Sequence, residues 1–277
     1  MVDRINGDGE PSAMPRAYDP VLDQVLAPLL TDLRGLLGDD LIGLYLYGSA
    51  VSGGFEPRVS DLDLVAIVRR SVADLDLSGL DRVHRKVVAR DPDWSDRLEI
   101  VYVARGALAG GAGSPDLLAV ISPGEPFHVT GPASGWLQNW YLARETGISL
   151  FGPPAPEVMP PVSHADFLAA VSQYLEYLRG QSAPPYAVLS ACRAVRTLET
   201  GVQCSKLEGA AWMRERMPEW AWLIDAALAC RLSGGAVGFD DVRTRKAAGR
   251  FVDLLAVTAQ RSMTLATPPG TVSADLI

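Results

Sequence analysis

The sequence predicts an α+β (mixed α/β) N-terminal domain with a small mixed sheet, followed by an all-α C-terminal helical bundle. Short apolar runs typical of strands occur only in the first half, a proline-rich stretch at 151–163 interrupts the chain, and beyond it apolar residues recur at helical spacing. We therefore expect a flexible tail at 1–18, a sheet domain at 19–155, a helical domain at 156–266 and a second tail at 267–277.

Composition narrows the functional classes. The 277 residues carry a net charge of −8, which argues against non-specific nucleic-acid binding because such binding relies on a basic surface. No apolar run reaches the roughly 18 residues of a membrane span, and the acidic start of the chain lacks an apolar signal segment. We expect a cytoplasmic protein, a monomer, with neither nucleic acid nor membrane as partner. The three cysteines, Cys192, Cys204 and Cys230, are expected to act as small hydrophobic residues in a reducing compartment.

The chain begins with an expected helix and strand, and a glycine-containing turn follows them. Leucine and valine at helical spacing over 21–37 predict a core-facing helix, and the apolar run 41–47 predicts a buried strand. Gly48 and Ser49 then end that strand. Glycine permits a close backbone approach, and backbone N–H groups in such a turn can hold phosphate oxygens. A short helical turn at 50–54 is expected to face the same site.

The second strand, expected at 61–68, carries two aspartates one residue apart. Side chains two residues apart share one face of a strand, so Asp61 and Asp63 point the same way while Leu62 and Leu64 enter the core. Two adjacent carboxylates repel each other, and a Mg²⁺ ion would cancel that cost. The alternative is that both aspartates only cap the strand and are solvated.

A helix at 74–89 and a third strand at 97–104 follow, and Glu99 interrupts the apolar residues of that strand. A buried, unpaired carboxylate is costly, which leaves two interpretations. Either the strand is an edge and Glu99 faces water, or Glu99 lies beside Asp61 and Asp63. We favour the second interpretation.

The remainder of the first half is less regular. We expect a loop at 106–113, a short helix at 115–121, a strand at 124–129 and a helix at 135–145. Trp136 and Trp140 lie four residues apart on this last helix, a spacing that favours packing over ligand stacking. The five prolines of 151–163 predict a linker without regular structure.

Helical spacing recurs five times beyond the prolines, at 165–178, 184–198, 206–216, 219–232 and 240–264. Ser205 and Glu208 have the spacing of a capping box. Two cations stand out, Arg193 in the middle of one helix and Lys206 in the first turn of the next. They are either solvated or paired with Glu199 and Glu208, or they bind an anionic ligand. An anion would relieve the unfavourable position of Lys206 against the helix dipole.

The order of these motifs resembles a known family. Gly48-Ser49, followed after eleven residues by Asp61-Leu62-Asp63, is similar to the signature of the polymerase-β-like nucleotidyltransferase superfamily. Further matches follow along most of the chain: Leu98-Glu99, a Trp-bearing helix before 147–153, Cys192-Arg193, Leu198-Glu199-Thr200-Gly201, Ser205-Lys206 and Ala211-Trp212. Together they resemble the bacterial aminoglycoside adenylyltransferases, which act on streptomycin and spectinomycin.

The resemblance implies a two-domain enzyme that transfers AMP from ATP to a hydroxyl group of an antibiotic, with ATP and Mg²⁺ in the cleft between its domains. It implies that Asp61 and Asp63 bind the metal and that Glu99 is the general base or a third metal ligand. The implied contacts of the triphosphate are Gly48, Ser49, Ser60, Arg193 and Lys206. Trp140 matches a tryptophan that lines the acceptor pocket.

One departure from the family concerns the acceptor. The family carries acidic residues just before the helix that bears the arginine matched by Arg193. The corresponding segment here, 181–186, contains no carboxylate. A dication such as streptomycin would lose its expected partners there. The alternatives are an adenylyltransferase for another acceptor, such as a metabolite or protein hydroxyl, a non-catalytic ATP-binding module, and an antitoxin-like minimal nucleotidyltransferase.

Overall fold

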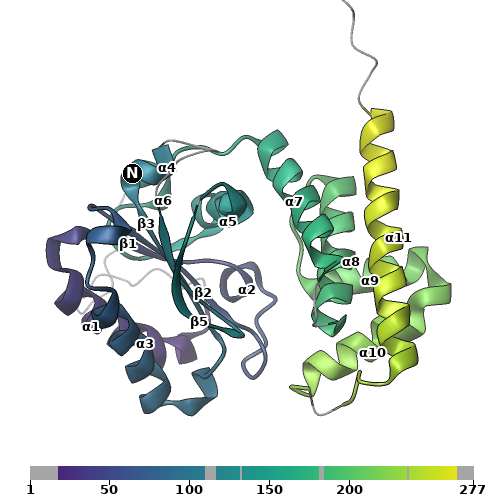
Figure 1. The fold of residues 1–277 in the computed structure, drawn as a ribbon, viewed down its shortest axis with the longest axis horizontal. Coiled ribbons are helices and arrows are strands. Elements are labelled where there is room, and N and C mark those ends of the chain that lie inside the picture. Colours follow the sequence, from purple (N-terminus) through teal and green to yellow (C-terminus); the bar gives the residue numbers. More distant parts are fainter. Residues whose placement is uncertain (1–17, 110–116, 132, 181–183, 236, 267–277) are drawn as a thin grey trace, which may run out of the picture. The chain divides into compact units, whose positions relative to one another are not determined.

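The computed structural model describes residues 18–109, 117–131, 133–180, 184–235 and 237–266 (Figure 1). The chain divides into two compact units. The first comprises the chain up to Phe55, Asp61–Ala133 and Leu142–Met159. The second comprises Glu56–Ser60, Ser134–Tyr141 and the chain from Pro160. Apart from Tyr18, the two predicted tails lie outside the described residues.

The first unit is built on a six-stranded mixed sheet, as predicted for the fold class. The strands are β1 (Leu41–Leu46), β2 (Leu62–Val68), β3 (Leu98–Ala104), β4 (Leu118–Ser122), β5 (Glu125–Thr130) and β6 (Ile148–Phe151). Their order in the sheet is β5-β4-β3-β2-β1-β6. Strands β2 and β3 run parallel, and the other neighbours are antiparallel.

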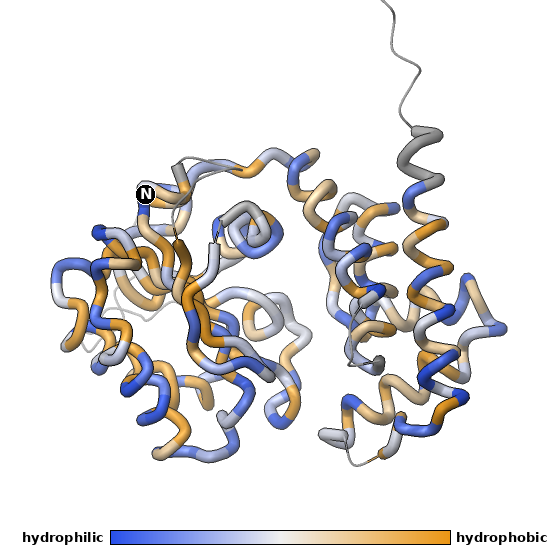
Figure 2. The backbone as a smooth tube through the Cα atoms, viewed as in Figure 1, coloured by the Kyte–Doolittle hydropathy of each residue, from blue (hydrophilic) through white to orange (hydrophobic). Residues whose placement is uncertain are grey.

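One face of the sheet is covered by α1 (Asp23–Leu37) and α3 (Leu77–Arg90), which lie side by side (Figure 1). Their apolar stripes pack on alternate strand residues, among them Leu62 and Leu64 of β2, both fully buried. The two-residue period therefore leaves Asp63 on the opposite face. Figure 2 shows the strands as predominantly hydrophobic.

The shorter helices of this region follow the turns between the strands. They are α2 (Ser49–Ser52), α4 (Arg105–Ala109), α5 (Leu137–Thr146) and α6 (Ala155–Val158). Single 3₁₀ turns lie at Pro20–Leu22, Gly38–Asp40, Val72–Asp74, Pro92–Trp94 and Ala133–Trp136. The short helix expected after Gly48-Ser49 is thus confirmed as α2.

Several local predictions were wrong. The short helix expected at 115–121 is strand β4 over its described part, because the apolar run Leu118–Ser122 pairs with β3 on one side and β5 on the other. The loop expected at 106–113 begins as helix α4, and its remainder lies outside the described residues. Strand β3 is not an edge, since β2 and β4 flank it, so the interpretation of Glu99 as an edge residue was wrong.

The proline-rich stretch is more ordered than predicted. Strand β6 pairs with β1 and ends at Phe151, two residues before the first proline. Helix α6 begins with prolines at its N-terminal positions, where a missing N–H costs nothing. Part of the segment predicted as a linker is therefore regular: its first residue ends β6, and Ala155–Val158 form α6.

The second unit contains α7 (His164–Leu178), α8 (Pro184–Thr200), α9 (Lys206–Arg216), α10 (Ala221–Leu232) and α11 (Val242–Ala266), with a 3₁₀ turn at Pro218–Trp220. Helix α8 packs against each of the other four, and no strand occurs in the described part of this unit, as predicted. The capping box of α9 is confirmed, with Ser205 N–H donating to Glu208 Oε2 at 2.8 Å and Glu208 N–H donating to Ser205 Oγ at 3.1 Å.

The core of this bundle comes from the stripes that the sequence predicts. Hydrophobic and hydrophilic residues alternate along α11 (Figure 2), and Phe251 on its apolar side is fully buried with Cys192 of α8. Cys204 and Cys230 are half-buried, and all three cysteines are free thiols. Within the described residues, no helix combines the length and apolar character that crossing a membrane requires.

Candidate functional site

The turn after β1 brings Gly48 against Asp63. Gly48 has φ 68° and ψ −144°, a conformation that residues with a side chain rarely adopt. A Cβ atom at this position would lie 2.0 Å from Asp63 Oδ2. The backbone is joined at the same point, because Tyr47 N–H donates to Asp63 O at 3.1 Å. Glycine is therefore required here both for its backbone conformation and for the space that the Asp63 carboxylate occupies.

Asp63 and Glu99 are direct neighbours on adjacent parallel strands. Residues in register on such strands point to the same face, so the two carboxylates lie side by side, as predicted. Tyr47, 2% exposed, donates its hydroxyl to Glu99 Oε1 at 3.2 Å. Sequence reasoning missed Tyr47. The signal was its place at the end of the strand that leads to Gly48.

Asp61 was expected within the second strand, but it lies one residue before β2 begins. Its neighbour Leu62 is held by a hydrogen bond from Leu62 N–H to Arg97 O at 2.8 Å. Asp61 and Asp63 are both partly exposed, while Leu62 and Leu64 are buried. This burial agrees with the predicted alternation.

The donor set suits a magnesium ion that a nucleotide helps to bind. In the described part of the chain, no group of three or more Asp, Glu, His or Cys side chains is arranged to hold a metal ion alone. Mg²⁺ is usually bound by one or two carboxylates, with substrate phosphates and water completing its shell. The side-by-side placement of Asp63 with Glu99, and of Asp61 two residues earlier, fits that requirement.

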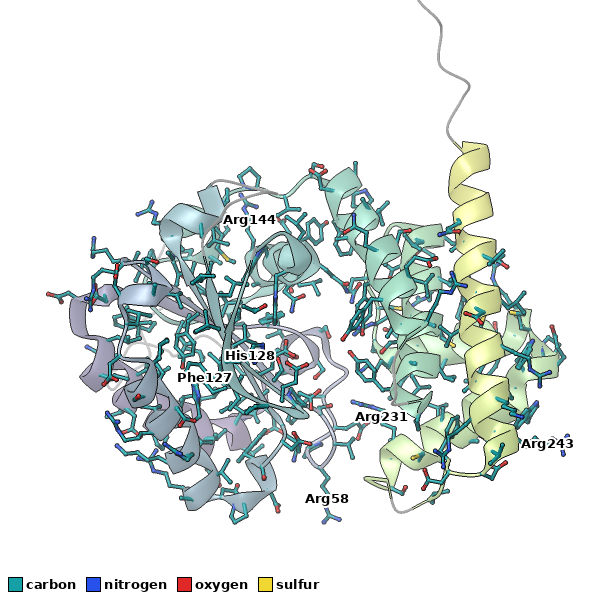
Figure 3. All side chains as sticks on the ribbon, in the orientation of Figure 1. Arg58, Phe127, His128, Arg144, Arg231 and Arg243 are labelled. Carbon is teal, nitrogen blue, oxygen red and sulfur yellow. The ribbon has the colours of Figure 1, made fainter. Side chains whose placement is uncertain are left out.

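The two serines predicted near the triphosphate have different surroundings. Ser49 is the first residue of α2, directly after Gly48. Ser60 belongs to the segment Glu56–Ser60 of the second unit and is 1% exposed. Its Oγ accepts from Glu56 N–H at 2.9 Å and from Nη2 of Arg231, a residue labelled in Figure 3, at 3.3 Å. Ser60 thus has a structural role that sequence reasoning missed, and its contact with phosphate stays a prediction.

Arg193 of α8 lies close to the backbone of α9, and Lys206 is in the first turn of α9. A Cβ atom at Gly209 would be 2.7 Å from Arg193 Cα, so only glycine allows this approach. Lys206 Nζ lies 4.2 Å from the centre of the Tyr186 ring, a cation–π contact. The hydroxyl of Tyr186 is 2.5 Å from that of Tyr174 on α7.

Glu199 and Glu208, which were considered as partners of these two cations, form ion pairs with other arginines. Glu199 forms an ion pair with Arg216 at 3.1 Å. Glu208 caps α9, and Arg196 lies 3.9 Å from it. These acceptor bonds lower the pKa of Glu208, chiefly through the backbone N–H of Ser205.

Trp140 is 5% exposed and stacks on Trp136, with ring centroids 6.1 Å apart. In the same unit, Tyr141 stacks on Phe167 of α7 at 4.1 Å. The packing role favoured for these aromatic residues is therefore observed. A role for Trp140 in binding the acceptor stays a prediction.

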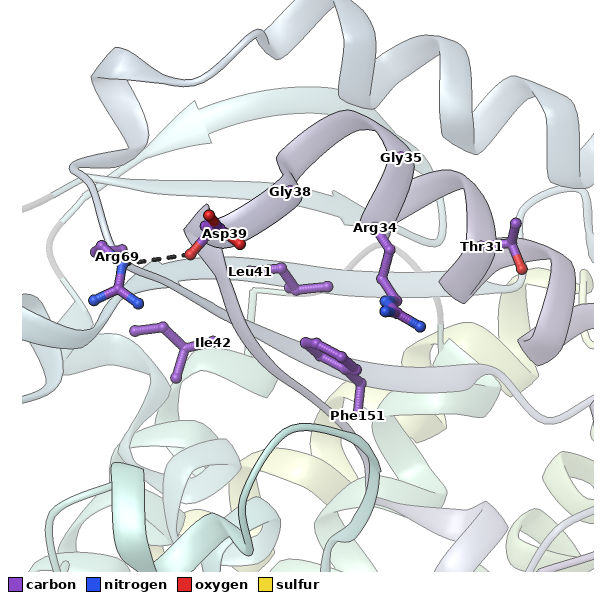
Figure 4. Close-up of a pocket in the computed structure, with 9 residues that line it drawn as sticks. All are labelled: Thr31, Arg34, Gly35, Gly38, Asp39, Leu41, Ile42, Arg69 and Phe151. Carbon is purple, nitrogen blue, oxygen red and sulfur yellow. Dashed lines mark hydrogen bonds between the residues drawn. The ribbon is translucent and has the colours of Figure 1, made fainter.

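A cavity of about 840 Å³ lies elsewhere in the first unit. Arg34, Asp39, Leu41 and Arg69 are among its lining residues (Figure 4). Leu41 begins β1 and Arg69 follows β2, whereas Gly48 and Asp63 lie at the other ends of those strands. This cavity is therefore separate from the predicted site.

Comparison with known proteins finds similar proteins over most of the chain. The sequence model of the family "aminoglycoside adenylyltransferase, C-terminal domain" matches residues 157–256. A spectinomycin 9-adenylyltransferase of Staphylococcus aureus is 26% identical over 213 residues, which are 70% of this chain and 79% of the relative. An aminoglycoside (3'') (9) adenylyltransferase of Klebsiella pneumoniae is 30% identical over 223 residues, which are 71% of this chain and 82% of the relative.

A solved structure shares the fold. It is the spectinomycin adenyltransferase AAD(9) from Enterococcus faecialis, crystallised with ATP and spectinomycin. The match has a TM-score of 0.69 at 19% identity and covers 86% of this chain and 98% of that chain. At this identity the likeness concerns the fold, and it agrees with a mixed α/β N-terminal part and a helical C-terminal part.

Proposed function

The chain belongs to the aminoglycoside adenylyltransferase family, and from this premise we propose that it transfers AMP from ATP to a hydroxyl group of spectinomycin or a related aminocyclitol. The family and the adenylyltransferase activity predicted from the motifs are confirmed by the relatives. The observation that carries the proposal is the pairing of Asp63 with Glu99 directly beside Gly48. We further propose domain boundaries near 155 and 266, and a monomeric, cytoplasmic enzyme.

Glu99 is the proposed general base. The acceptor hydroxyl attacks the α-phosphorus of ATP, its proton passes to the Glu99 carboxylate, and the bond to pyrophosphate breaks. The hydroxyl of Tyr47 holds one oxygen of that carboxylate, which limits its rotation. Orientation of this kind matters because a base must lie within hydrogen-bond reach of the proton that it takes.

Asp61 and Asp63 are the proposed ligands of Mg²⁺, which when bound neutralises charge on the phosphates and on the pyrophosphate. The backbone N–H groups of Gly48 and Ser49 are the proposed contacts of phosphate oxygens, because Gly48 forms a turn with positive φ and Ser49 begins α2. Arg193 and Lys206 are the proposed positively charged contacts of the triphosphate. The Tyr186 ring under Lys206 Nζ restricts that side chain through a cation–π contact.

The proposed acceptor is chosen by the kind of group that the antibiotic presents. Streptomycin carries two guanidinium groups, and 181–186 offers them no carboxylate. In the described part of this segment stands Tyr186, whose hydroxyl is within hydrogen-bond distance of Tyr174. Neutral hydroxyl groups suit an acceptor that presents hydroxyls and carbonyls better than one that presents guanidinium groups. Spectinomycin is accordingly preferred to streptomycin.

The test is Mg²⁺-dependent release of pyrophosphate from ATP, with spectinomycin, streptomycin or no acceptor. We expect release with spectinomycin, much less with streptomycin, and none in Glu99→Gln, which should still bind ATP by calorimetry. Full activity of Glu99→Gln would refute the assignment of the base. Bound ATP without release for either antibiotic would place the acceptor outside this class.

A further inference from the structure

The segment that leads into Asp61 is closed by its own hydrogen bonds. Ser60 N–H donates to Glu56 O at 2.8 Å, and Glu56 N–H donates to Ser60 Oγ at 2.9 Å. These two bonds join the first and last residues of Glu56–Ser60 into a ring. The Ser60 hydroxyl is therefore a structural part of the loop and is buried accordingly.

A cation from α10 completes this arrangement. Arg231, in the last turn of the helix, donates from Nη2 to Ser60 Oγ at 3.3 Å. A hydroxyl has two lone pairs and one proton, so with both lone pairs accepting, any third hydrogen bond must be donated by Ser60. The positive charge also suits the C-terminal end of the helix dipole. Helix α10 ends immediately afterwards, where Ser233 N–H bonds to Ala229 O.

We propose that Arg231 is a positioning residue for the adenylyl-transfer reaction. Asp61 lies outside β2, so the ladder of the sheet does not include it. Both of its neighbours are hydrogen-bonded: Leu62 to Arg97 O, and Ser60 to Glu56 and Arg231. Arg231 acts through Ser60 to restrict the position of the Asp61 carboxylate. The inference rests on the proposed function, because it assumes Mg·ATP at Asp61.

Binding of Mg·ATP, measured by calorimetry, is the first readout. We expect Arg231→Gln to bind about tenfold more weakly, the size of losing one hydrogen bond from a charged donor, and Arg231→Lys to recover part of the loss. The KM for ATP should rise while kcat changes less. Arg214→Gln is the matched control, since Arg214 pairs with Asp225 on the bundle surface and should leave both constants unchanged.

A double-mutant cycle decides whether Arg231 acts through Ser60. Ser60→Ala combined with Arg231→Gln should bind Mg·ATP no more weakly than Ser60→Ala alone. Additive losses, or wild-type affinity of Arg231→Gln, would overturn the inference while leaving the proposed function intact. Failure of the wild-type protein to bind Mg·ATP would overturn both. Thermal unfolding of each variant identifies a loss that comes from instability alone.

Discussion

Replacing Gly48 with alanine tests whether the turn after β1 sets the position of Asp63. The added Cβ would lie 2.0 Å from Asp63 Oδ2 and 2.7 Å from its Cγ, far inside van der Waals contact. Either the carboxylate or the turn must move. The backbone at φ 68° and ψ −144° adds strain of about 1–3 kcal/mol for a residue with a side chain.

We expect Gly48→Ala to lose about 1–3 kcal/mol of unfolding free energy and at least about 100-fold in turnover, because Asp63 is displaced from its place beside Glu99. Denaturant unfolding measures the first quantity and pyrophosphate release the second. Gly53→Ala is the control: Gly53 also has positive φ, 82°, but a Cβ there meets nothing within 4 Å. It should show strain without loss of Mg·ATP affinity. Wild-type Mg·ATP affinity and turnover in Gly48→Ala would refute the reasoning.

Three further outcomes are expected. Tyr47→Phe removes the hydroxyl that holds Glu99 Oε1, so kcat should fall about tenfold while calorimetric ATP affinity is retained; an unchanged kcat would contradict the positioning role. Tyr186→Leu removes the ring beneath Lys206 and should raise the KM for ATP several-fold, whereas Tyr186→Phe keeps the ring and should not; equal effects would exclude the cation–π contact. Burial lowers the pKa of His84 from 6.5 to about 4. Its neutral form is therefore favoured in the folded state, and stability should be lost as the pH falls from 6.5 towards 4, by about 3 kcal/mol in all. His84→Gln, which can still form a hydrogen bond with the Tyr102 hydroxyl, should flatten that part of the pH–stability curve. If the variant and the wild-type protein gave the same curve, His84 would not be the cause of this pH dependence.

Much of the site follows from local sequence. A two-residue period is enough to place Asp63 opposite Leu62 and Leu64, and a Ser-x-x-Glu spacing is enough to begin α9 at Lys206. These features depend on residues within a few positions of each other, and the physics of a single strand or helix end determines them. The same holds for Gly48, whose φ is set by a turn that the residue type itself favours.

Other features depended on partners far along the chain. Residues 118–122 became a strand because β3 and β5 pair with them, and Ile148–Phe151 became one because β1 does. The Tyr47–Glu99 bond joins residues 52 positions apart, and the Arg231–Ser60 bond joins residues 171 apart. Hydrogen bonds of this kind form only when folding brings the two distant groups together. The residues around either partner therefore do not predict which group it will contact. The sequence by itself therefore determined the family, the strand face on which Asp63 lies and the start of helix α9. Only the tertiary structure decided which strands pair and which side chains hold those carboxylates and their loops in place.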